Sequence, residues 1–314
     1  MNQSTGKHYV GVDVCKAKLD VSCPAIPGHH TFDNTPAGIR SLFAKLRSLD
    51  LPAHLVVEPT GGYEGLLMEA AFASRIAVSR VDALRVRNFA MARGSLAKTD
   101  KVDAEVLAAF GQAFHPVPAM APSPAQKALA AATRRRDVLV RNLAREKNAL
   151  EKVSDPFVRK DIKAAMAFLE RRIEASDKQI DGIIRADKEL SWKRERMEKV
   201  KGVGPVTSAL LVAGLPELGK TSDNGICALV GVAPLNNDSG PRRGKRSIRG
   251  GRAHVRRGLY MPMMSAVRFN PILKEFYQRL IGKNKPHHVA MVAVMRKLIR
   301  LLNRMLADPD FQPT

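Results

Sequence analysis

The stretch HYVGVDV at residues 8–14 decides the fold of the first part of this chain. This run and KLDVSC at 18–23 are short, rich in valine and separated by a tight turn, so both are predicted to be strands. A third strand is predicted at 29–33, and Asn34 or Thr35 then caps a helix that reaches about Leu49. Three strands in succession predict a sheet that begins with a meander.

Helices and strands alternate after this meander. Apolar runs at 54–58 and 76–81 are predicted to be strands, and helices are predicted at 63–74, 83–92 and 101–114. This order of elements predicts an α/β domain built on a ribonuclease H-like sheet.

Four carboxylates occupy positions at which this fold would bring them together. Asp13 lies on the first strand and Glu58 ends the central strand, while Asp100 and Asp103 face the same way at the start of a helix. Clustered carboxylates can hold two hard cations about 4 Å apart, and the sequence offers no His/Cys cluster that would favour zinc. The residues therefore predict a site for two Mg²⁺ ions, which Mn²⁺ could replace.

Each of these carboxylates also has an ordinary structural explanation. Asp100 or Thr99 could cap the helix, and Asp103 could be a solvated acid in its first turn. Asp13 is harder to explain in this way, because a carboxylate in an apolar strand loses hydration unless it is paired or binds a cation. Three neighbouring acids are the alternatives if one assignment is wrong: Asp20, Glu64 and Glu105.

The net charge of +22 is distributed unevenly along the chain. Residues 1–116 hold 13 Lys and Arg against 11 Asp and Glu, a net of +2, so the remaining 198 residues carry +20. Between 241 and 300 there are 16 basic residues and one acid, Glu275. Such a field favours polyanions, so DNA or RNA is the predicted partner, with an anionic membrane surface as the simpler alternative.

The sequence shows no apolar run long enough to span a bilayer and no signal peptide. The three cysteines, Cys15, Cys23 and Cys227, lack metal-binding or redox spacing and are predicted to be reduced core thiols. These features predict a cytoplasmic protein without a membrane partner.

Three parts are predicted along the chain: the α/β domain at 1–116, a helical coiled-coil spacer at 117–195 and a mainly α basic domain at 196–314. Four prolines between 116 and 124 mark the linker. Heptad spacing, broken only near Ser176, relates six apolar residues of the spacer: Ile162, Met166, Leu169, Ile173, Ile180 and Ile183. An antiparallel hairpin within the chain and a coiled coil between chains both fit.

The third part begins with MEKVKGVGPVTSALLVAGL at 197–215, a pattern typical of a helix-hairpin-helix. Gly202 and Gly204 permit a tight turn whose N–H groups could bind a phosphate, and an ordinary helical turn is the alternative. Residues 240–257 are rich in Gly and Arg and hold no acid. Phosphate contacts are predicted for the basic residues of this segment: Arg242, Arg243, Lys245, Arg246, Arg249, Arg252, Arg256 and Arg257.

Ser239 lies in the turn PLNNDSG, just ahead of this basic cluster. A serine hydroxyl needs a base or a metal ion before it can attack phosphorus. The carboxylate site could activate it if the two domains meet, with the cations holding the phosphate. Serine before glycine is also a common turn residue, and the residues alone leave both explanations open.

The chain resembles the DEDD insertion-sequence transposases, relatives of the Piv DNA invertase that carry a RuvC-like N-terminal domain. The resemblance covers essentially the whole chain and rests on GVDVCKAKLDV, VVEPTGGYE, AKTDKVDAEVLAAF, KGVGPVTSALLVAGLPELG and LVGVAPLNNDSG with the following RRGKRSIRGGR. It implies that the four carboxylates are the DEDD metal ligands. It also implies that Ser239 is a nucleophile that forms a phosphoserine link to DNA.

The resemblance further implies a bacterial, nucleoid-associated enzyme that excises and inserts its own element in double-stranded DNA. Such recombinases are guided by a structured non-coding RNA that the element encodes. They assemble as homo-oligomers, dimers or tetramers, in which the RuvC-like domain of one subunit joins the serine domain of another.

Three other functions are compatible with the residues. A RuvC-like nuclease acting on Holliday junctions or other DNA structures would use water and would not need Ser239. A non-catalytic nucleic-acid-binding protein on the same scaffold would not depend on metal. An actin- or sugar-kinase-like ATPase is suggested by GVDV, but the sequence shows no second Gly-rich phosphate loop.

Overall fold

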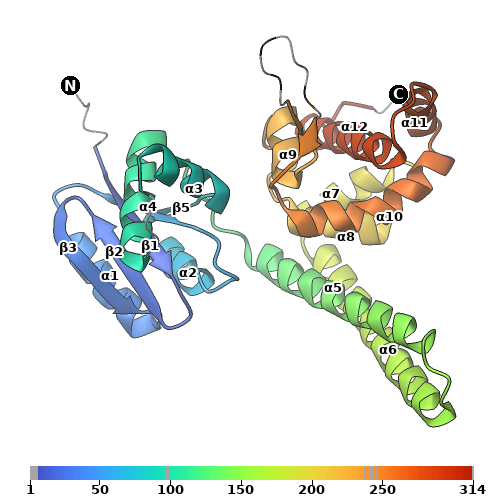
Figure 1. The fold of residues 1–314 in the computed structure, drawn as a ribbon, viewed down its shortest axis with the longest axis horizontal. Helices are drawn as coiled ribbons and strands as arrows, with labels where there is room; N and C mark the ends of the chain where they lie inside the picture. Colours follow the sequence, from blue (N-terminus) through green and yellow to red (C-terminus); the bar gives the residue numbers. More distant parts are fainter. Residues whose placement is uncertain are drawn as a thin grey trace. The chain divides into compact units, whose positions relative to one another are not determined.

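The computed structural model describes residues 6–95, 99–236, 238, 240, 244 and 246–312, and it forms two compact units (Figure 1). The first comprises Met1–Ala121 and the second Pro122–Thr314. The side chains of Asp100 and Lys101 also lie outside the described part. The boundary between the two units falls among the prolines of 116–124.

A five-stranded sheet of order β3-β2-β1-β4-β5 forms the centre of the first unit. Its strands are β1 (His8–Val14), β2 (Lys18–Cys23), β3 (Ile26–Asp33), β4 (Ala53–Val57) and β5 (Ala77–Arg80). The first three pair antiparallel in the predicted meander, and β4 and β5 run parallel to β1. Consequently β1, β3, β4 and β5 end at one edge, called here the carboxyl edge. This topology is compatible with a ribonuclease H-like fold.

Helices cover both faces of this sheet (Figure 1). They are α1 (Pro36–Arg47), α2 (Gly65–Ala73), α3 (Ala83–Ala92) and α4 (Asp100–Phe114). Side chains alternate between the faces of a strand, so Val10 and Val12 are buried with Leu42 on the side of α1 and α2. On the other side, Tyr9 is buried with Leu107 of α4.

Helix α4 approaches the sheet closely at Gly11. A Cβ atom at this position would lie 2.0 Å from the carbonyl oxygen of Ala104, so only glycine fits beneath the helix. A Cβ atom on Gly111 would lie 2.7 Å from Cδ1 of Tyr9. Tyr9 precedes Gly11 in the strand, whereas its neighbour Gly111 follows Ala104 in the helix. Helix α4 therefore runs antiparallel to β1.

The start of the linker runs along β5, the outer strand on its side of the sheet. Ser79 Oγ donates to the carbonyl oxygen of Val117 at 2.8 Å, and the amide of Ala119 donates to the carbonyl oxygen of Val78 at 2.8 Å. His54 Nε2 lies 2.8 Å from Ser79 Oγ, and since the serine proton serves the carbonyl, the histidine nitrogen is the donor. Residues 117–119 are therefore fixed to the first unit.

The second unit is almost entirely helical. Its elements are α5 (Pro124–Leu150), α6 (Pro156–Ala186), α7 (Lys188–Glu198), α8 (Pro205–Gly214), α9 (Asp223–Val230), β6 (Pro234–Leu235), β7 (Ser247–Ile248), α10 (Ala253–Phe269), α11 (Pro271–Gly282) and α12 (His287–Ala307). One face of α12 lies deep in the core of this unit, with Val294, Leu298 and Leu302 fully buried.

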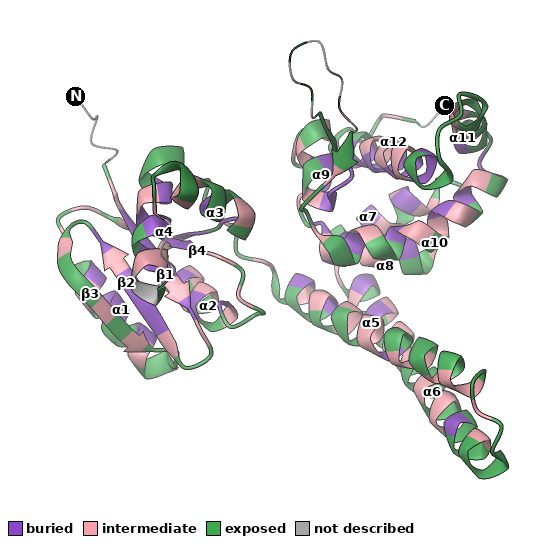
Figure 2. Cartoon of the chain, viewed as in Figure 1, coloured by how far each residue is buried: buried purple, intermediate pink, exposed green. Residues whose placement is uncertain are grey.

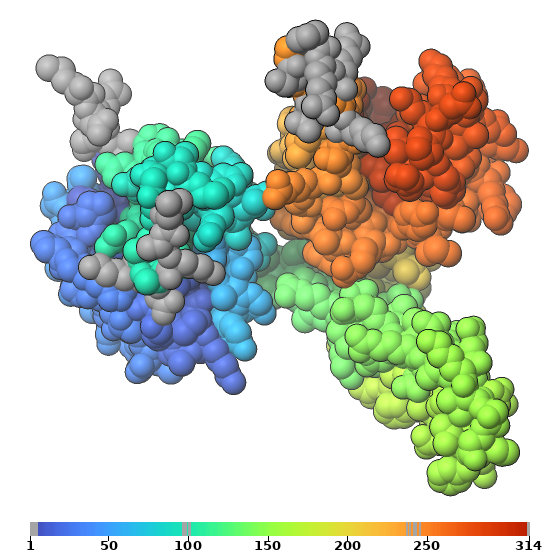
Figure 3. Space-filling model, in the orientation of Figure 1, coloured from blue at the N-terminus to red at the C-terminus, as the bar shows by residue number. Residues whose placement is uncertain are grey.

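Helices α5 and α6 form an antiparallel pair that projects as a narrow arm of the second unit (Figure 3). Ion pairs that join Arg136 to Asp177 and Lys147 to Glu170 fix this direction. The predicted apolar stripe of α6 is buried or half-buried along the pair (Figure 2). The hairpin within the chain is thus the observed arrangement, and a coiled coil between chains stays a prediction.

The base of the helix pair shares a core with the rest of the second unit. Leu129 of α5 and Ile184 of α6 are fully buried in the same cluster as α8 and α12. The division into three parts at 116 and 195 stays a prediction, whereas the chain groups into two compact units.

No helix among the described residues is long and apolar enough to cross a membrane. Cys23 and Cys227 are buried, Cys15 is half-buried, and all three are free thiols. Burial raises the pKa of the Cys23 and Cys227 thiols, as expected of the predicted core residues.

Candidate active site

Two of the predicted carboxylates occupy neighbouring positions at the carboxyl edge. In the parallel pair of β1 and β4, Val12 lies opposite Val57, so Asp13 and Glu58 are one residue further on. By the alternation of strand residues, both share the face of Val56, which α4 covers. Both are half-buried. The strand ends at Val57, so Glu58 follows it directly and does not end it as predicted.

The first turn of α4 lies at the same edge. Gly11 lies beneath Ala104 and the helix runs antiparallel to β1, so Asp13, two residues along the strand, lies opposite that turn. Asp103 is half-buried in this turn, and Asp100 is the first residue of the helix. Strand and helix thus bring three described carboxylates, and the backbone of the fourth, to one edge.

The cap of α4 is Thr99, whose Oγ1 accepts a hydrogen bond from the amide of Val102 at 3.3 Å. Asp100 is therefore not required as the N-cap. The N-terminus of a helix carries a positive partial charge, which stabilises ionised carboxylates in its first turn. The N-terminus of α4 therefore provides a favourable electrostatic environment for the carboxylates in its first turn, which would have to be ionised to bind a cation.

The oxygen ligands that Mg²⁺ prefers are the donors available at this edge. Within the described part of the chain, no three His, Cys, Asp or Glu side chains lie close enough together to hold a metal ion. Asp100 does not enter this finding, because its side chain is outside the described residues. The donor chemistry fits a hard cation, and the metal site itself stays a prediction.

Asp20, the first alternative acid, pairs with Asp13 across β1 and β2 but has other partners. Its carboxylate lies 2.9 Å from Thr31 Oγ1 and His29 Nε2 and forms an ion pair with Lys18 Nζ at 3.0 Å. Burial alone would raise the pKa of Asp20, but the hydrogen bonds of these three residues outweigh it and lower the pKa. Asp20 therefore stabilises the pairing of β2 with β3.

Glu64 shapes the loop that follows β4. Its carboxylate accepts hydrogen bonds from the amides of Thr60 at 3.1 Å and Gly62 at 3.0 Å, and it pairs with Arg80 at 3.6 Å. These bonds keep the chain beyond Glu58 in one conformation.

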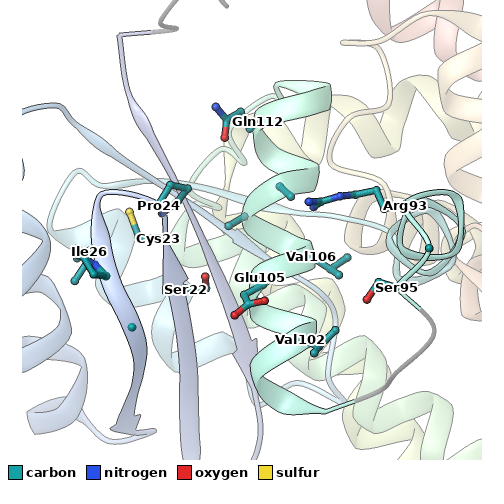
Figure 4. Close-up of a pocket in the computed structure, with 15 residues that line it drawn as sticks. Ser22, Cys23, Pro24, Ile26, Arg93, Ser95, Val102, Glu105, Val106 and Gln112 are labelled. Carbon is teal, nitrogen blue, oxygen red and sulfur yellow. The ribbon is translucent and has the colours of Figure 1, made fainter.

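Glu105, the third alternative, is exposed and lines a groove of about 710 Å³ between α4, the end of α3 and the β2–β3 turn (Figure 4). Cys23, Arg93 and Gln112 also line this groove. The described lining of this groove includes neither Asp13, Glu58 nor Asp103, so the groove is distinct from the positions of those three carboxylates.

Two residues that shape this edge were missed by the sequence analysis. Gly11 could have been predicted, since an isolated glycine in an apolar strand often marks a close backbone approach. The sequence predicts only a helix-capping role for Asn34, whereas its side chain bonds to the loops after β1 and β4. No local signal indicates such bonds, because the loops meet only in the folded chain.

Ser239 lies outside the described residues, as do Asn237, Lys245 and 241–243. The flanks of its segment are described: Pro234 of β6 pairs with Ile248 of β7. The amide of Gly244 donates to Asp238 Oδ1 at 3.1 Å. The structure describes the two strands that flank residues 236–246, called here the serine segment, and the role of Ser239 stays a prediction.

The described arginines of the basic segment differ in their partners. Arg252 donates to both carboxylate oxygens of Glu217, at 2.6 and 2.7 Å, and to the carbonyl oxygen of Gly214 at 2.8 Å. Arg256 donates to three carbonyl oxygens, including that of Gly250 at 2.8 Å. The exposed members of the predicted phosphate-binding set are Arg246, Arg249 and Arg257. Some of these arginines therefore anchor the segment, while others face solvent.

A turn with two glycines joins α7 to α8. Gly202 has φ +97°, and a Cβ atom there would lie 2.5 Å from Cβ of Ala266, so this glycine packs against α10. Gly204 caps α8, and a Cβ atom there would meet no neighbour within 4 Å. The two helices and the tight turn are as expected, and phosphate binding by this turn stays a prediction.

Known proteins resemble both units of the chain. Residues 10–155 match a model of IS110-type DEDD transposases, and residues 194–278 match one described as the transposase IS116/IS110/IS902 family. Pilin gene-inverting proteins of Moraxella bovis and Moraxella lacunata are each 27% identical over 308 residues, which is 94% of this chain and of theirs. An uncharacterized protein of insertion element IS116 from Streptomyces clavuligerus is 29% identical over 151 residues, or 47% of this chain and 37% of that one.

Proposed function

Because the chain belongs to the IS110-type DEDD transposase family, it is a DNA recombinase, and we propose that it excises and inserts its own insertion sequence. In this proposal a carboxylate–metal site and a serine nucleophile act together on double-stranded DNA. The main support is that Asp13, Glu58 and the first turn of α4 meet at one edge of the sheet.

Divalent metal ions are general cofactors of DEDD transposases. Four residues would hold two Mg²⁺ ions: Asp13, Glu58, Asp100 and Asp103. Mn²⁺ accepts the same oxygen ligands. When bound, the ions supply charge stabilisation of the scissile phosphate and activation of the attacking hydroxyl.

Ser239 is the proposed nucleophile. Its Oγ loses a proton and forms a bond to phosphorus, while the bond from phosphorus to one deoxyribose oxygen breaks and that oxygen takes up a proton. The hydroxyl of a second strand end then attacks the phosphoserine, and the serine recovers its proton. Each step exchanges one P–O bond for another, so strands are joined without hydrolysis.

Exposed cations of the basic segment would bind the DNA backbone. Arg246, Arg249 and Arg257 face solvent, and Arg242, Arg243 and Lys245 are their neighbours in sequence. The same chemistry suits a structured guide RNA encoded by the element, which we propose as a second partner. Phosphate contacts position a nucleic acid without reading its sequence, so a pairing RNA would supply the choice of target.

A homo-oligomer, a dimer or a tetramer, completes the proposed assembly. Phe157 and Phe168 on the α5–α6 arm are 80% and 55% exposed, and large apolar side chains in such positions favour contact with another chain. In an oligomer, the serine segment of one subunit would meet the carboxylate edge of another.

The test uses a plasmid that carries the gene with its flanking DNA, and it scores circular excised junctions by amplification. Wild type is compared with Asp13→Ala, Ser239→Ala and the control Glu105→Gln. Glu105 lies on α4 two residues from Asp103, but it is exposed and lines the separate groove. Junctions are expected only from wild type and the control.

The runner-up function is a RuvC-like nuclease that uses water, since the carboxylate edge lies wholly within the first unit. Junctions from Ser239→Ala but not from Asp13→Ala would favour it over the serine mechanism. Junctions from Asp13→Ala would contradict the metal site.

A further inference from the structure

Asn34 joins the loop that follows β1 to the loop that follows β4. Its side-chain Nδ2 donates to the carbonyl oxygen of Cys15 at 2.9 Å and to that of Tyr63 at 3.2 Å. Cys15 follows Asp13 by two residues, and Tyr63 follows Glu58 by five. A single amide group therefore connects the chain beyond β1 with the chain beyond β4.

The sheet fixes Asn34 in this position. It directly follows β3, whose last residue, Asp33, pairs with Lys18. Its backbone amide donates to the carbonyl oxygen of Ala17 at 2.9 Å. Thr35 accepts the capping bond of α1 from Gly38, so the side chain of Asn34 is not needed as the helix cap.

Each of the two loops is also closed by bonds of its own. In the first loop, the amide of Cys15 donates to the carbonyl oxygen of Lys18 at 2.9 Å, and the amide of Lys18 donates to Cys15 Sγ at 3.2 Å. In the second loop, Glu64 accepts from the amides of Thr60 and Gly62. A bond between two such closed loops fixes their spacing.

The bonding of Asn34 requires an amide. An asparagine NH₂ group has two protons, and here each serves one carbonyl oxygen. The Oδ1 atom is shielded from solvent and has no hydrogen-bond partner within the described residues. An aspartate at this position would place a charged oxygen against two carbonyl oxygens and would push the loops apart.

We propose that Asn34 is a positioning residue that sets the separation of Asp13 and Glu58 and thereby the affinity of their edge for a divalent cation. This role rests on the proposed metal site. Metal ligands must be held to within about 0.5 Å, and loss of a group that orients them weakens metal binding about 10- to 100-fold. Asn34 contacts the backbone beside the ligands and does not itself bind the cation.

The experiment measures Mn²⁺ binding to the full chain without DNA, from the electron paramagnetic resonance signal of free Mn²⁺. Asn34→Ala and Asn34→Asp are compared with Thr35→Ala, which removes the neighbouring helix cap but bonds to neither loop. Asp13→Asn is the reference for loss of the site. The Asn34 variants are expected to bind Mn²⁺ about 10- to 100-fold more weakly, and Thr35→Ala within about twofold of wild type.

Melting temperatures separate positioning from stability, since Thr35→Ala is expected to lower the melting temperature without weakening Mn²⁺ binding. Asn34→Ser, whose hydroxyl can bond one loop, takes the place of Asn34→Ala if that variant does not fold. If the Asn34 variants bind Mn²⁺ as tightly as Thr35→Ala does and Asp13→Asn does not bind it, the metal site stands and only the positioning role of Asn34 is overturned. Wild-type binding by Asp13→Asn would overturn the metal site and the role of Asn34 with it.

Discussion

The carboxylate edge and the chain that follows the serine segment are held in place by different kinds of bond. At the edge, strand pairing and the close contact of α4 with Gly11 position Asp13 through the backbone. The serine segment lies between two strands of two residues each, and side chains such as Arg252 and Arg256 secure the chain that follows it. A backbone-held site depends on how the fold packs, whereas a side-chain-held segment depends on individual arginines. Residue type alone does not separate arginines that anchor the segment from those free to bind phosphate.

The largest effect is expected within one turn of α4. Asp103→Asn should lower the rate of DNA cleavage by about 10³-fold, because one charged ligand of the proposed metal site is lost. Glu105→Gln, two residues away on the exposed side, should change the rate less than about threefold. Cleavage rates measured on a labelled DNA substrate check this prediction. Similar losses of rate in both variants would show that acids on α4 act only through their negative charge and not as metal ligands.

Acid should destabilise the first unit through His54. Burial lowers the pKa of this histidine to about 4, with a smaller contribution from Lys7. The unfolded histidine titrates near 6.5, so between pH 6.5 and 4 the unfolded chain binds a proton that the folded chain does not. The stability contributed by neutral His54 is complete above pH 6.5 and falls as the pH drops, by about 2–3 kcal/mol at pH 4.5.

Urea unfolding at pH 7 and pH 4.5, followed by circular dichroism, measures this loss. Carboxylates titrate in the same range, so the comparison is between wild type and His54→Gln, which keeps a donor for Ser79. Between pH 7 and pH 4.5, the free energy of unfolding of His54→Gln should fall by about 2–3 kcal/mol less than that of wild type. An identical loss in the two proteins would assign the acid sensitivity to other groups.

A single added methyl group should disrupt the close packing of α4 against β1. Gly11→Ala places a methyl group where 2.0 Å is available, which should cost about 1–3 kcal/mol and move the first turn of α4 away from Asp13. Gly65→Ala is the control, since no atom lies within 4 Å of a Cβ there and alanine favours a helix. Thermal unfolding should separate the two variants, and equal melting temperatures would contradict the backbone-held edge.

The smallest effects should separate the arginines of the second unit. Arg252→Ala should lower stability by about 1 kcal/mol, since its pair with Glu217 is partly exposed. Arg257→Ala should leave the melting temperature unchanged but reduce the slope of log affinity for DNA against log salt by about 1. Binding titrations at several salt concentrations, together with melting curves, check both, and a reversed pattern would exchange the two roles.

Much of the first unit could be predicted because its signals are local. Alternating apolar residues placed β1 and β2, and Thr99 capped a helix that the sequence began one residue later. The neighbouring positions of Asp13 and Glu58 follow from the expected strand order, because parallel neighbours end at one edge.

Contacts between distant residues could not be predicted in the same way. Arg252 meets Glu217 across 35 residues, and Asn34 meets Tyr63 across 29. Neither pairing follows from periodicity or a motif, because each depends on how separate elements pack. Charge composition therefore gives the net charge of each region but not which basic side chains bond within the fold.

The linker residues that run along β5 have a consequence for cutting the chain. An uncovered outer strand offers free N–H and C=O groups to another molecule and promotes aggregation. The amide of Ala119 bonds to the backbone carbonyl oxygen of Val78 on that strand, and Val117 accepts a bond from the side chain of Ser79. Both bonds are lost if the chain is cut at residue 116. A fragment ending at 116 should therefore aggregate, whereas one ending at 121 should remain dispersed in gel filtration. In that case the residues that lead to the second unit also limit self-association of the first.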